Sequence, residues 1–214
     1  MYKISPSSIN LMLECPRCFW LQIVKKIKRP ATIFPSLPSG MDKILKTHFD
    51  TYMVKGQLPP ELKENKEVEG CKLFDDIKKL EVWRSNFKGL QYEEEGVLLR
   101  GAVDNILVRR DTLIVLDYKT RGYPLKEDTH EHYRVQMDLY NFLLRKNGYK
   151  SADYSFLLFY YPNRVTSTGE VVFDTKLVKV SVGDGEKVFK SAIKLLKKKN
   201  IPKGSKDCPF CKLV

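Results

Sequence analysis

Apolar and polar positions in the middle of the chain predict two neighbouring β-strands. The first predicted strand, Val97–Val108, is polar at only three positions, one of which is Asp104. The second, Leu113–Thr120, begins with a near-continuous apolar run, which is typical of a buried strand. The polar residues 109–112 between them predict a turn. We therefore expect a hairpin that carries a carboxylate near the end of each strand.

Helical periodicity predicts a helix on either side of this hairpin. Met41–Val54 has an apolar face that includes His48, and Glu131–Lys146 carries Gln136 and Tyr140 on one face. Taken alone, His48 is typical of a core histidine, and Gln136 and Tyr140 are typical of helix packing.

The rest of the chain predicts shorter elements around this centre. Ser5 and Pro6 predict a capped helix start, and Pro16 is expected to interrupt that helix. The further predicted elements are a helical turn at 19–28, an extended connector at 29–39, a helix at 71–79, strands at 154–161 and 170–182 with a loop at 162–169, and a helix at 186–200.

The spacing Asp117-Tyr118-Lys119 is the main chemical signal. Because side chains alternate along a strand, Asp117 and Lys119 are expected on one face and Tyr118 on the other. An in-register hairpin brings Asp104 close to Asp117, and two adjacent carboxylates repel unless a cation lies between them. Mg²⁺ or Mn²⁺ would fit, with Lys119 stabilising negative charge on a phosphate or hydroxide. A solvated strand end is the alternative interpretation of the same triplet.

The order of the motifs along the chain adds to this signal. A helix histidine (His48) is followed by Gly101-Ala102-Val103-Asp104, by Asp117-Tyr118-Lys119 and by Gln136-Met137-Asp138-Leu139-Tyr140. In this order they resemble the RecB-like branch of the PD-(D/E)XK nuclease superfamily, which shows a helix histidine, G-x-x-D, D/E-x-K and Q-x-x-x-Y. Val103 stands where the nominal motif has proline. The resemblance covers nearly the whole chain.

The resemblance implies a fold and a role for each motif residue. The implied fold is α/β, a restriction-endonuclease-like core with a central mixed β-sheet flanked by helices. His48, Asp104, Asp117 and the Tyr118 carbonyl would hold one or two Mg²⁺ or Mn²⁺ ions, which help water to attack a phosphodiester. Lys119 would stabilise the attacking hydroxide and the transition state. Gln136 would orient this group and Tyr140 would brace it.

Composition and charge are compatible with such a protein. The chain has 214 residues and a net charge of +12, which favours a polyanionic partner, although a lysine-rich surface explains the charge equally well. No apolar stretch is long enough to span a membrane, and the first residues lack the apolar core of a signal peptide. We therefore expect a cytoplasmic protein that does not enter membranes.

Four of the five cysteines form two matching C-P-x-C motifs, Cys15 with Cys18 and Cys208 with Cys211. Four thiolates are the ligand count of a tetrahedral Zn²⁺ site or a 4Fe–4S cluster. AddB and CRISPR-associated nucleases of the RecB-like branch carry a 4Fe–4S cluster with one early and three late cysteines, whereas this chain has two and two. We favour the cluster, with structural Zn²⁺ as the alternative. In both cases the site would join the two ends of the chain.

Together these observations predict one nuclease domain over residues 1–214, in which residues 1–40 and 200–214 form a cysteine-joined subdomain. The predicted activity is metal-dependent hydrolysis of DNA by an exonuclease that acts on single strands or free ends. It would serve DNA repair, recombination or CRISPR adaptation, with other proteins of those systems as further partners. The alternatives are a catalytically weak nucleic-acid-binding module and a scaffold with structural zinc.

Overall fold

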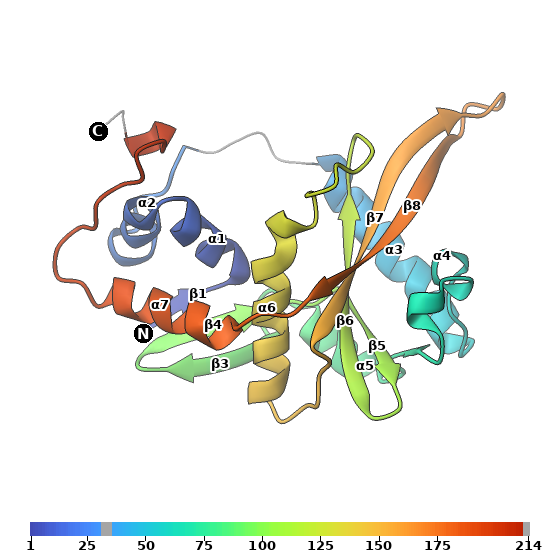
Figure 1. The fold of residues 1–214 in the computed structure, drawn as a ribbon, viewed down its shortest axis with the longest axis horizontal. Helices are drawn as coiled ribbons and strands as arrows, with labels where there is room; N and C mark the ends of the chain where they lie inside the picture. Colours follow the sequence, from blue (N-terminus) through green and yellow to red (C-terminus); the bar gives the residue numbers. More distant parts are fainter. Residues whose placement is uncertain (31–35, 212–214) are drawn as a thin grey trace.

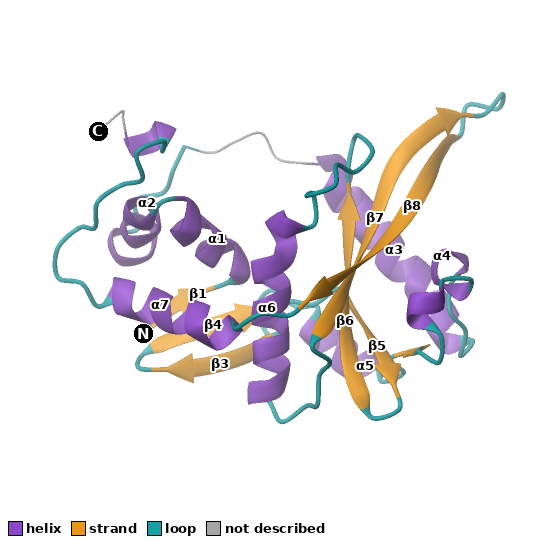
Figure 2. Cartoon of the chain, viewed as in Figure 1, coloured by secondary structure: helices purple, strands orange, loops and turns teal. Residues whose placement is uncertain are grey.

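The computed structural model describes residues 1–30 and 36–211, and its described strands form two sheets (Figures 1 and 2). The strands are β1 (Tyr2–Ile4), β2 (Lys72–Leu73), β3 (Leu90–Glu94), β4 (Val97–Gly101), β5 (Asn105–Arg109), β6 (Thr112–Thr120), β7 (Tyr154–Val165) and β8 (Val171–Ser181). A three-stranded sheet has the order β1-β4-β3, and a five-stranded sheet has the order β2-β5-β6-β7-β8. The pairs β1–β4 and β6–β7 are parallel and the other pairs are antiparallel, so both sheets are mixed.

Helices surround the two sheets. They are α1 (Pro6–Glu14), α2 (Pro16–Trp20), a π-helical turn (Leu21–Lys25), α3 (Ser36–Val54), α4 (Pro60–Lys63), α5 (Ile77–Trp83), α6 (Glu131–Lys146) and α7 (Gly185–Leu196), with 3₁₀ turns at Lys66–Val68 and Pro209–Cys211. Figure 1 shows α6 standing between the sheets, with α1, α2 and α7 on one side of it and α3 on the other. Helix α6 contacts strands of both sheets. None of the described helices combines the length and the apolarity needed to cross a membrane.

The predicted α/β class with mixed sheets and flanking helices is confirmed, but two sheets stand where one central sheet was expected. The predicted strand Val97–Val108 is in fact two strands, β4 and β5, which belong to different sheets. Between them, the amide of Val103 donates to the Trp83 carbonyl (3.1 Å) and not to a strand ladder, and the Val103 side chain is fully buried. Asp104 therefore lies in the short segment that connects β4 of one sheet to β5 of the other.

Other predicted boundaries also move. Helix α3 begins at Ser36 and includes part of the predicted connector, because proline is tolerated in the first turn of a helix, where Pro38 lies. The rest of the connector, residues 31–35, lies outside the described residues. The helix expected at 71–79 is β2 followed by α5, because residues 72–73 pair with β5 and Asp76 caps α5 through the Lys79 amide (3.0 Å). The predicted turn of helix after Phe19 ends at Lys25, before Lys26 with φ 62°.

Strand β7 continues through part of the predicted loop at 162–169. Beyond Tyr160 the strand pairs only with β8, because the pairing with β6 ends at Thr120–Tyr160. Pro162 lacks an N–H donor, and it is accommodated at this free edge beside a bulge. The β7–β8 hairpin therefore extends beyond the rest of the sheet, as Figure 1 shows.

The beginning of the chain folds as predicted. Ser5 caps α1 and accepts a hydrogen bond from the Ser8 amide (3.3 Å), and Pro6 is the first helical residue. Cys15 is extended, and Pro16 then opens α2, so the proline separates two helices. The apolar periodicity of residues 41–54 predicts Ile44 on the inner face of α3, but Ile44 is 63% exposed, whereas Leu45 and Phe49 are buried.

Candidate active site

The end of β6 places Asp117 and Lys119 side by side. The two side chains form an ion pair on one face of the strand, and the Asp117 residue is 1% exposed. Tyr118 points to the other face, where its hydroxyl accepts a hydrogen bond from Asn105 Nδ2 (2.7 Å) and its ring lies 4.5 Å from that of Phe49. This is the alternation that the sequence predicts for a strand.

Asp104 is held beside this pair by three contacts. Its Oδ2 accepts from the backbone amide of Tyr118 (3.1 Å), and its carbonyl accepts from Arg84 Nε (2.7 Å). Its Oδ1 lies 3.1 Å from Lys46 Nζ of α3. The β5–β6 pairing begins with Asn105 opposite Leu116. Because the two strands are antiparallel, Asp104, which precedes Asn105, lies near Asp117, which follows Leu116. Two carboxylates thus meet at this end of the hairpin.

The electrostatics of the pair depend on burial and on neighbouring charge. Burial raises the pKa of Asp117 to about 7, and the charge of Asp104 adds to the rise, although Lys119 opposes it. Burial acts to lower the pKa of Lys119, but the carboxylates of Asp117 and Asp104 outweigh it and the pKa rises overall. Lys119 therefore keeps its proton at neutral pH, which suits a group that stabilises negative charge.

Helix α6 supplies a polar contact to the same lysine. Gln136 Oε1 accepts from Lys119 Nζ (3.1 Å), and Gln136 Nε2 donates to the Tyr140 hydroxyl (2.7 Å). The same nitrogen lies 3.5 Å from Asp117 Oδ1. The structure therefore brings together five residues predicted for the catalytic site: Asp104, Asp117, Lys119, Gln136 and Tyr140.

The glycine of the G-x-x-D motif has a packing role at this site. A Cβ atom on Gly101 would lie 2.7 Å from Leu143 Cδ1 and 3.0 Å from two ring atoms of Tyr140. Such distances are too short for a Cβ atom unless the side chains of Leu143 and Tyr140 move. Gly101 therefore allows β4 to approach the helix that carries Gln136.

The donor set fits a hard divalent cation. Two carboxylates lie close together, and Asp117 Oδ2 is buried without a hydrogen bond, its contact being the Lys119 ion pair. Lys46 bridges Asp104 to Asp42 (2.8 Å), so two ammonium groups offset the charge of the carboxylates. Oxygen ligands of this kind are those that Mg²⁺ and Mn²⁺ prefer.

His48 lies on α3 but is directed to a different carboxylate. Its Nε2 lies 3.0 Å from Glu61 Oε1 of α4, and that oxygen also accepts from the Tyr160 hydroxyl (3.0 Å). Within residues 1–30 and 36–211, the four cysteines are the only group of three or more His, Cys, Asp or Glu ligand atoms gathered within 4.8 Å. The ligand atoms of His48, Asp104 and Asp117 therefore do not all lie within 4.8 Å of one another. The role of His48 as a metal ligand stays a prediction.

Sequence reasoning did not find three side chains that contact predicted site residues: Lys46 and Arg84 contact Asp104, and Glu61 contacts His48. Lys46 had a weak signal, since it lies four residues after Asp42 on one helix face. Glu61 and Arg84 reach His48 and Asp104 only through the tertiary fold, from α4 and from the residue that follows α5. A single sequence carries no sign of such contacts.

The four cysteines converge at the ends of the chain. Sγ–Sγ distances are 3.5 Å for Cys15–Cys211 and 3.6 Å for both Cys18–Cys208 and Cys18–Cys211. All four sulfur atoms lie within 4.8 Å of one another. The fifth cysteine, Cys71, lies outside this group and packs against the main core. The prediction that the two C-P-x-C motifs form one site is therefore confirmed.

Charge and backbone donors surround the cysteine site. Arg29 donates to Cys208 Sγ (3.7 Å), and its guanidinium lies 4.6 Å from the Phe210 ring. Burial acts to raise the pKa of Cys15, but hydrogen bonds from the backbone amides of Cys18 and Ser205 bring it to about 6. Burial and the neighbouring thiols raise the pKa of Cys211 to about 12. Without a cation, thiols at this spacing cannot all ionise.

Comparison with known families agrees with this geometry. The model of the PD-(D/E)XK nuclease superfamily matches residues 41–213, which include both carboxylates, Lys119 and α6. The chain belongs to this superfamily. Its members are nucleases that use divalent metals, which makes nucleic acid the substrate class. A search of curated proteins found no match to the chain.

Proposed function

We propose that the protein is a Mg²⁺- or Mn²⁺-dependent deoxyribonuclease of the RecB-like branch, acting as an exonuclease on single strands or free DNA ends. The observation that carries the proposal is the pairing of buried Asp117 with half-buried Asp104 beside a protonated Lys119. The motif order around this pair supports the RecB-like branch. We place its action in the cytoplasm, in DNA repair, recombination or CRISPR adaptation, with proteins of those systems as partners.

Each site residue has a role that its contacts support. Asp104, Asp117 and the Tyr118 carbonyl would hold the divalent ion, with His48 as a further ligand once it leaves Glu61. When bound, the ion supplies Lewis acidity to the phosphate and to the attacking water. Lys119 stabilises the negative charge that builds up on the attacked phosphate, because its ammonium is fixed in a largely water-excluded position. Gln136 sets the position of Lys119, and Tyr140 fixes the Gln136 amide.

A cleavage time course tests this proposal. End-labelled linear single-stranded DNA, linear double-stranded DNA, circular DNA and RNA are incubated with Mn²⁺, Mg²⁺ or EDTA. The expected result is metal-dependent cleavage of linear DNA that Asp117→Ala abolishes. Asp111→Ala is the matched control, because Asp111 is exposed in the β5–β6 turn. Cleavage of circular DNA would contradict the exonuclease assignment, and cleavage that persists in Asp117→Ala would contradict this active site.

The alternative function is a nucleic-acid-binding or scaffold module with a decayed site. The preserved contacts of Lys119 with both Asp117 and Gln136 favour catalysis, since a decayed site need not keep them. A wild-type protein that binds DNA in a salt-sensitive way, yet cleaves none of the substrates with either ion, would favour the nucleic-acid-binding or scaffold module.

We propose further that the four cysteines hold one tetrahedral Zn²⁺ and that residues 1–40 and 200–214 form a subdomain around it within a single domain of residues 1–214. A zinc ion with bonds of about 2.3 Å to four thiolates spaces the sulfur atoms about 3.8 Å apart. The observed distances of 3.5 and 3.6 Å are close to that value. In a 4Fe–4S cluster each thiolate binds its own iron, and the cluster core holds the thiolates farther apart.

Metal analysis tests this assignment. The protein is expressed with both zinc and iron available and is purified without oxygen. The expected result is about one zinc per chain and no broad visible absorption. Cys18→Ser should lose the metal, whereas Cys71→Ser should retain it because Cys71 lies outside the site. Four irons per chain in a brown protein would overturn the assignment and restore the cluster.

A further inference from the structure

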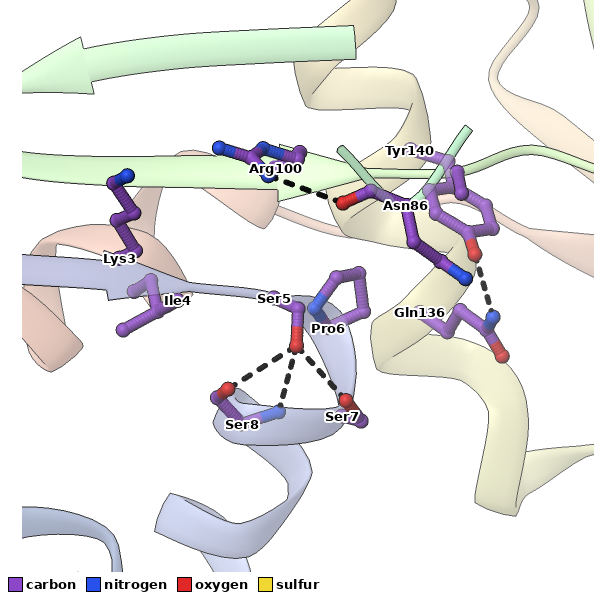
Figure 3. Close-up of a pocket in the computed structure, with 11 residues that line it drawn as sticks. Lys3, Ile4, Ser5, Pro6, Ser7, Ser8, Asn86, Arg100, Gln136 and Tyr140 are labelled. Carbon is purple, nitrogen blue, oxygen red and sulfur yellow. Dashed lines mark hydrogen bonds between the residues drawn. The ribbon is translucent and has the colours of Figure 1, made fainter. Parts of the chain in front are cut away.

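A cavity of about 390 Å³ opens beside Gln136 and Tyr140 of the active site (Figure 3). Its walls come from β1, the start of α1, β4 and α6. Gln136 and Tyr140 of the active site form one wall, and Ala102 adds a small residue there. The cavity therefore shares Gln136 with the active site, where Gln136 accepts from Lys119, although no sequence motif pointed to the cavity.

Two cationic side chains line the cavity. Strands β1 and β4 are parallel, with Lys3 opposite Leu98, so Lys3 and Arg100 stand on the same face of the sheet. Arg100 Nη1 donates to the Asn86 carbonyl (3.1 Å), which fixes the guanidinium at the wall. Arg100 Nε is buried without a hydrogen-bond partner in the described structure. The lining residues include no aspartate or glutamate, so the cavity carries an excess of positive charge.

Neutral donors complete the lining. Ser5, Ser7 and Ser8 lie at the beginning of α1, where the helix dipole favours an anion. Tyr140 is 5% exposed, and its hydroxyl accepts from Gln136 while its own proton has no acceptor in the described part of the chain. Hydroxyl, amide and guanidinium donors without a carboxylate are the groups that bind phosphate oxygens.

We propose that this cavity binds a phosphate group of the DNA strand that is being cut, together with part of its nucleotide. The proposal rests on the nuclease function above. The volume falls in the range that holds a small molecule of nucleotide size and exceeds what a phosphate ion alone would fill. Since Gln136 belongs to both sites, a phosphate held here belongs to a nucleotide near the scissile bond. The phosphate is either a terminal one or an internal phosphodiester.

DNA binding measured in EDTA tests the proposal without reference to cleavage. The probes are short fluorescein-labelled single strands of one sequence with a 5′-phosphate, a 3′-phosphate or no terminal phosphate. The variant is Lys3→Gln/Arg100→Gln. The matched control is Lys66→Gln/Arg110→Gln, which removes the same charges from exposed positions in the 3₁₀ turn before β2 and in the β5–β6 turn. Circular dichroism checks that both variants are folded.

The expected result is an affinity decrease of about tenfold or more in the cavity variant and little change in the control. The slope of log K against log salt should become shallower by about 0.7 for each phosphate that the variant no longer neutralises. A decrease confined to one terminally phosphorylated probe identifies a terminal phosphate, whereas an equal decrease for all probes identifies an internal phosphodiester. Unchanged affinity and salt dependence in the cavity variant would overturn the proposal. Because cleavage is measured separately, failure of the nuclease proposal is distinguishable.

Discussion

Lys119 of β6 is held by Gln136 of α6, with Lys119 Nζ 3.1 Å from Gln136 Oε1. The other end of the same amide donates to the Tyr140 hydroxyl, so the Gln136 side chain cannot rotate without breaking one of these hydrogen bonds. The ammonium of Lys119 is therefore positioned from two directions, by Asp117 on its own strand and by a helix that packs between the sheets. This relationship links the fold of α6 to the proposed chemistry.

The first prediction concerns Gln136 as a positioning residue. Gln136→Met removes the acceptor of Lys119 and should lower kcat by about 10- to 100-fold, with a smaller change in KM, because a misplaced ammonium stabilises the transition state less. Tyr140→Phe removes the hydroxyl that accepts from Gln136 Nε2 but leaves the acceptor of Lys119 in place, so it should lower kcat less. Steady-state cleavage kinetics measure both values, and Gln57→Met, at an exposed position, is the control. Equal loss in the Gln57 and Gln136 variants would contradict the positioning role.

The second prediction concerns Gly101. Gly101→Ala places a methyl group against Leu143 and the Tyr140 ring, so the unfolding free energy should fall by about 1–3 kcal/mol. Cleavage should fall as well, because displaced Tyr140 carries Gln136 with it. Urea denaturation and cleavage rates measure the two effects. Gly40→Ala is the matched control, since a Cβ at Gly40 meets nothing within 4 Å. A Gly101→Ala protein that is as stable as the Gly40→Ala control would contradict the prediction. It would show that Leu143 and Tyr140 can accommodate the methyl group without loss of stability.

Some of this site is predictable from sequence because it depends on local pattern. Helix α6 has the predicted bounds Glu131–Lys146, since its apolar periodicity is regular over four turns. The ion pair of Asp117 with Lys119 follows from strand alternation, and the proximity of Asp104 follows from hairpin pairing. The four-cysteine site follows from two matching motifs.

The rest depends on tertiary contacts that leave no local pattern. The chain passes from β4 to β5 where the Val103 amide donates to the Trp83 carbonyl. The sequence there is a nearly continuous apolar stretch, so it gives no sign that one strand ends and another begins. His48 is on a helix whose period predicts an inward direction, yet Glu61 of a separate short helix binds its ring. The cavity at Lys3 and Arg100 exists because β1, at the start of the chain, pairs with β4 nearly a hundred residues later.

The third prediction is that divalent metal binding releases protons. Because the pKa of Asp117 is raised to about 7 in the metal-free protein, the carboxyl is partly protonated near neutral pH, and a proton competes with the ion. The affinity for Mn²⁺ should therefore rise as pH increases from about 6 to 8 and level off above the pKa. Calorimetry in two buffers of different ionisation heat measures the released protons. Mn²⁺ binding that releases no protons near neutral pH, or an affinity that stays constant from about pH 6 to 8, would contradict the prediction.

The fourth prediction concerns His48, whose Nε2 contacts Glu61 in the present structure. If His48 helps to hold the ion, His48→Gln should raise the Mn²⁺ concentration for half-maximal cleavage by about tenfold, while cleavage at saturating Mn²⁺ changes less. Glu61→Gln should shift the same curve in the opposite direction or leave it unchanged, because it releases the imidazole. The control is His130→Gln, since His130 pairs with Glu131 at the start of α6. A His48→Gln curve that coincides with the control would remove His48 from the metal site and leave it as a partner of Glu61 that joins α3 to α4.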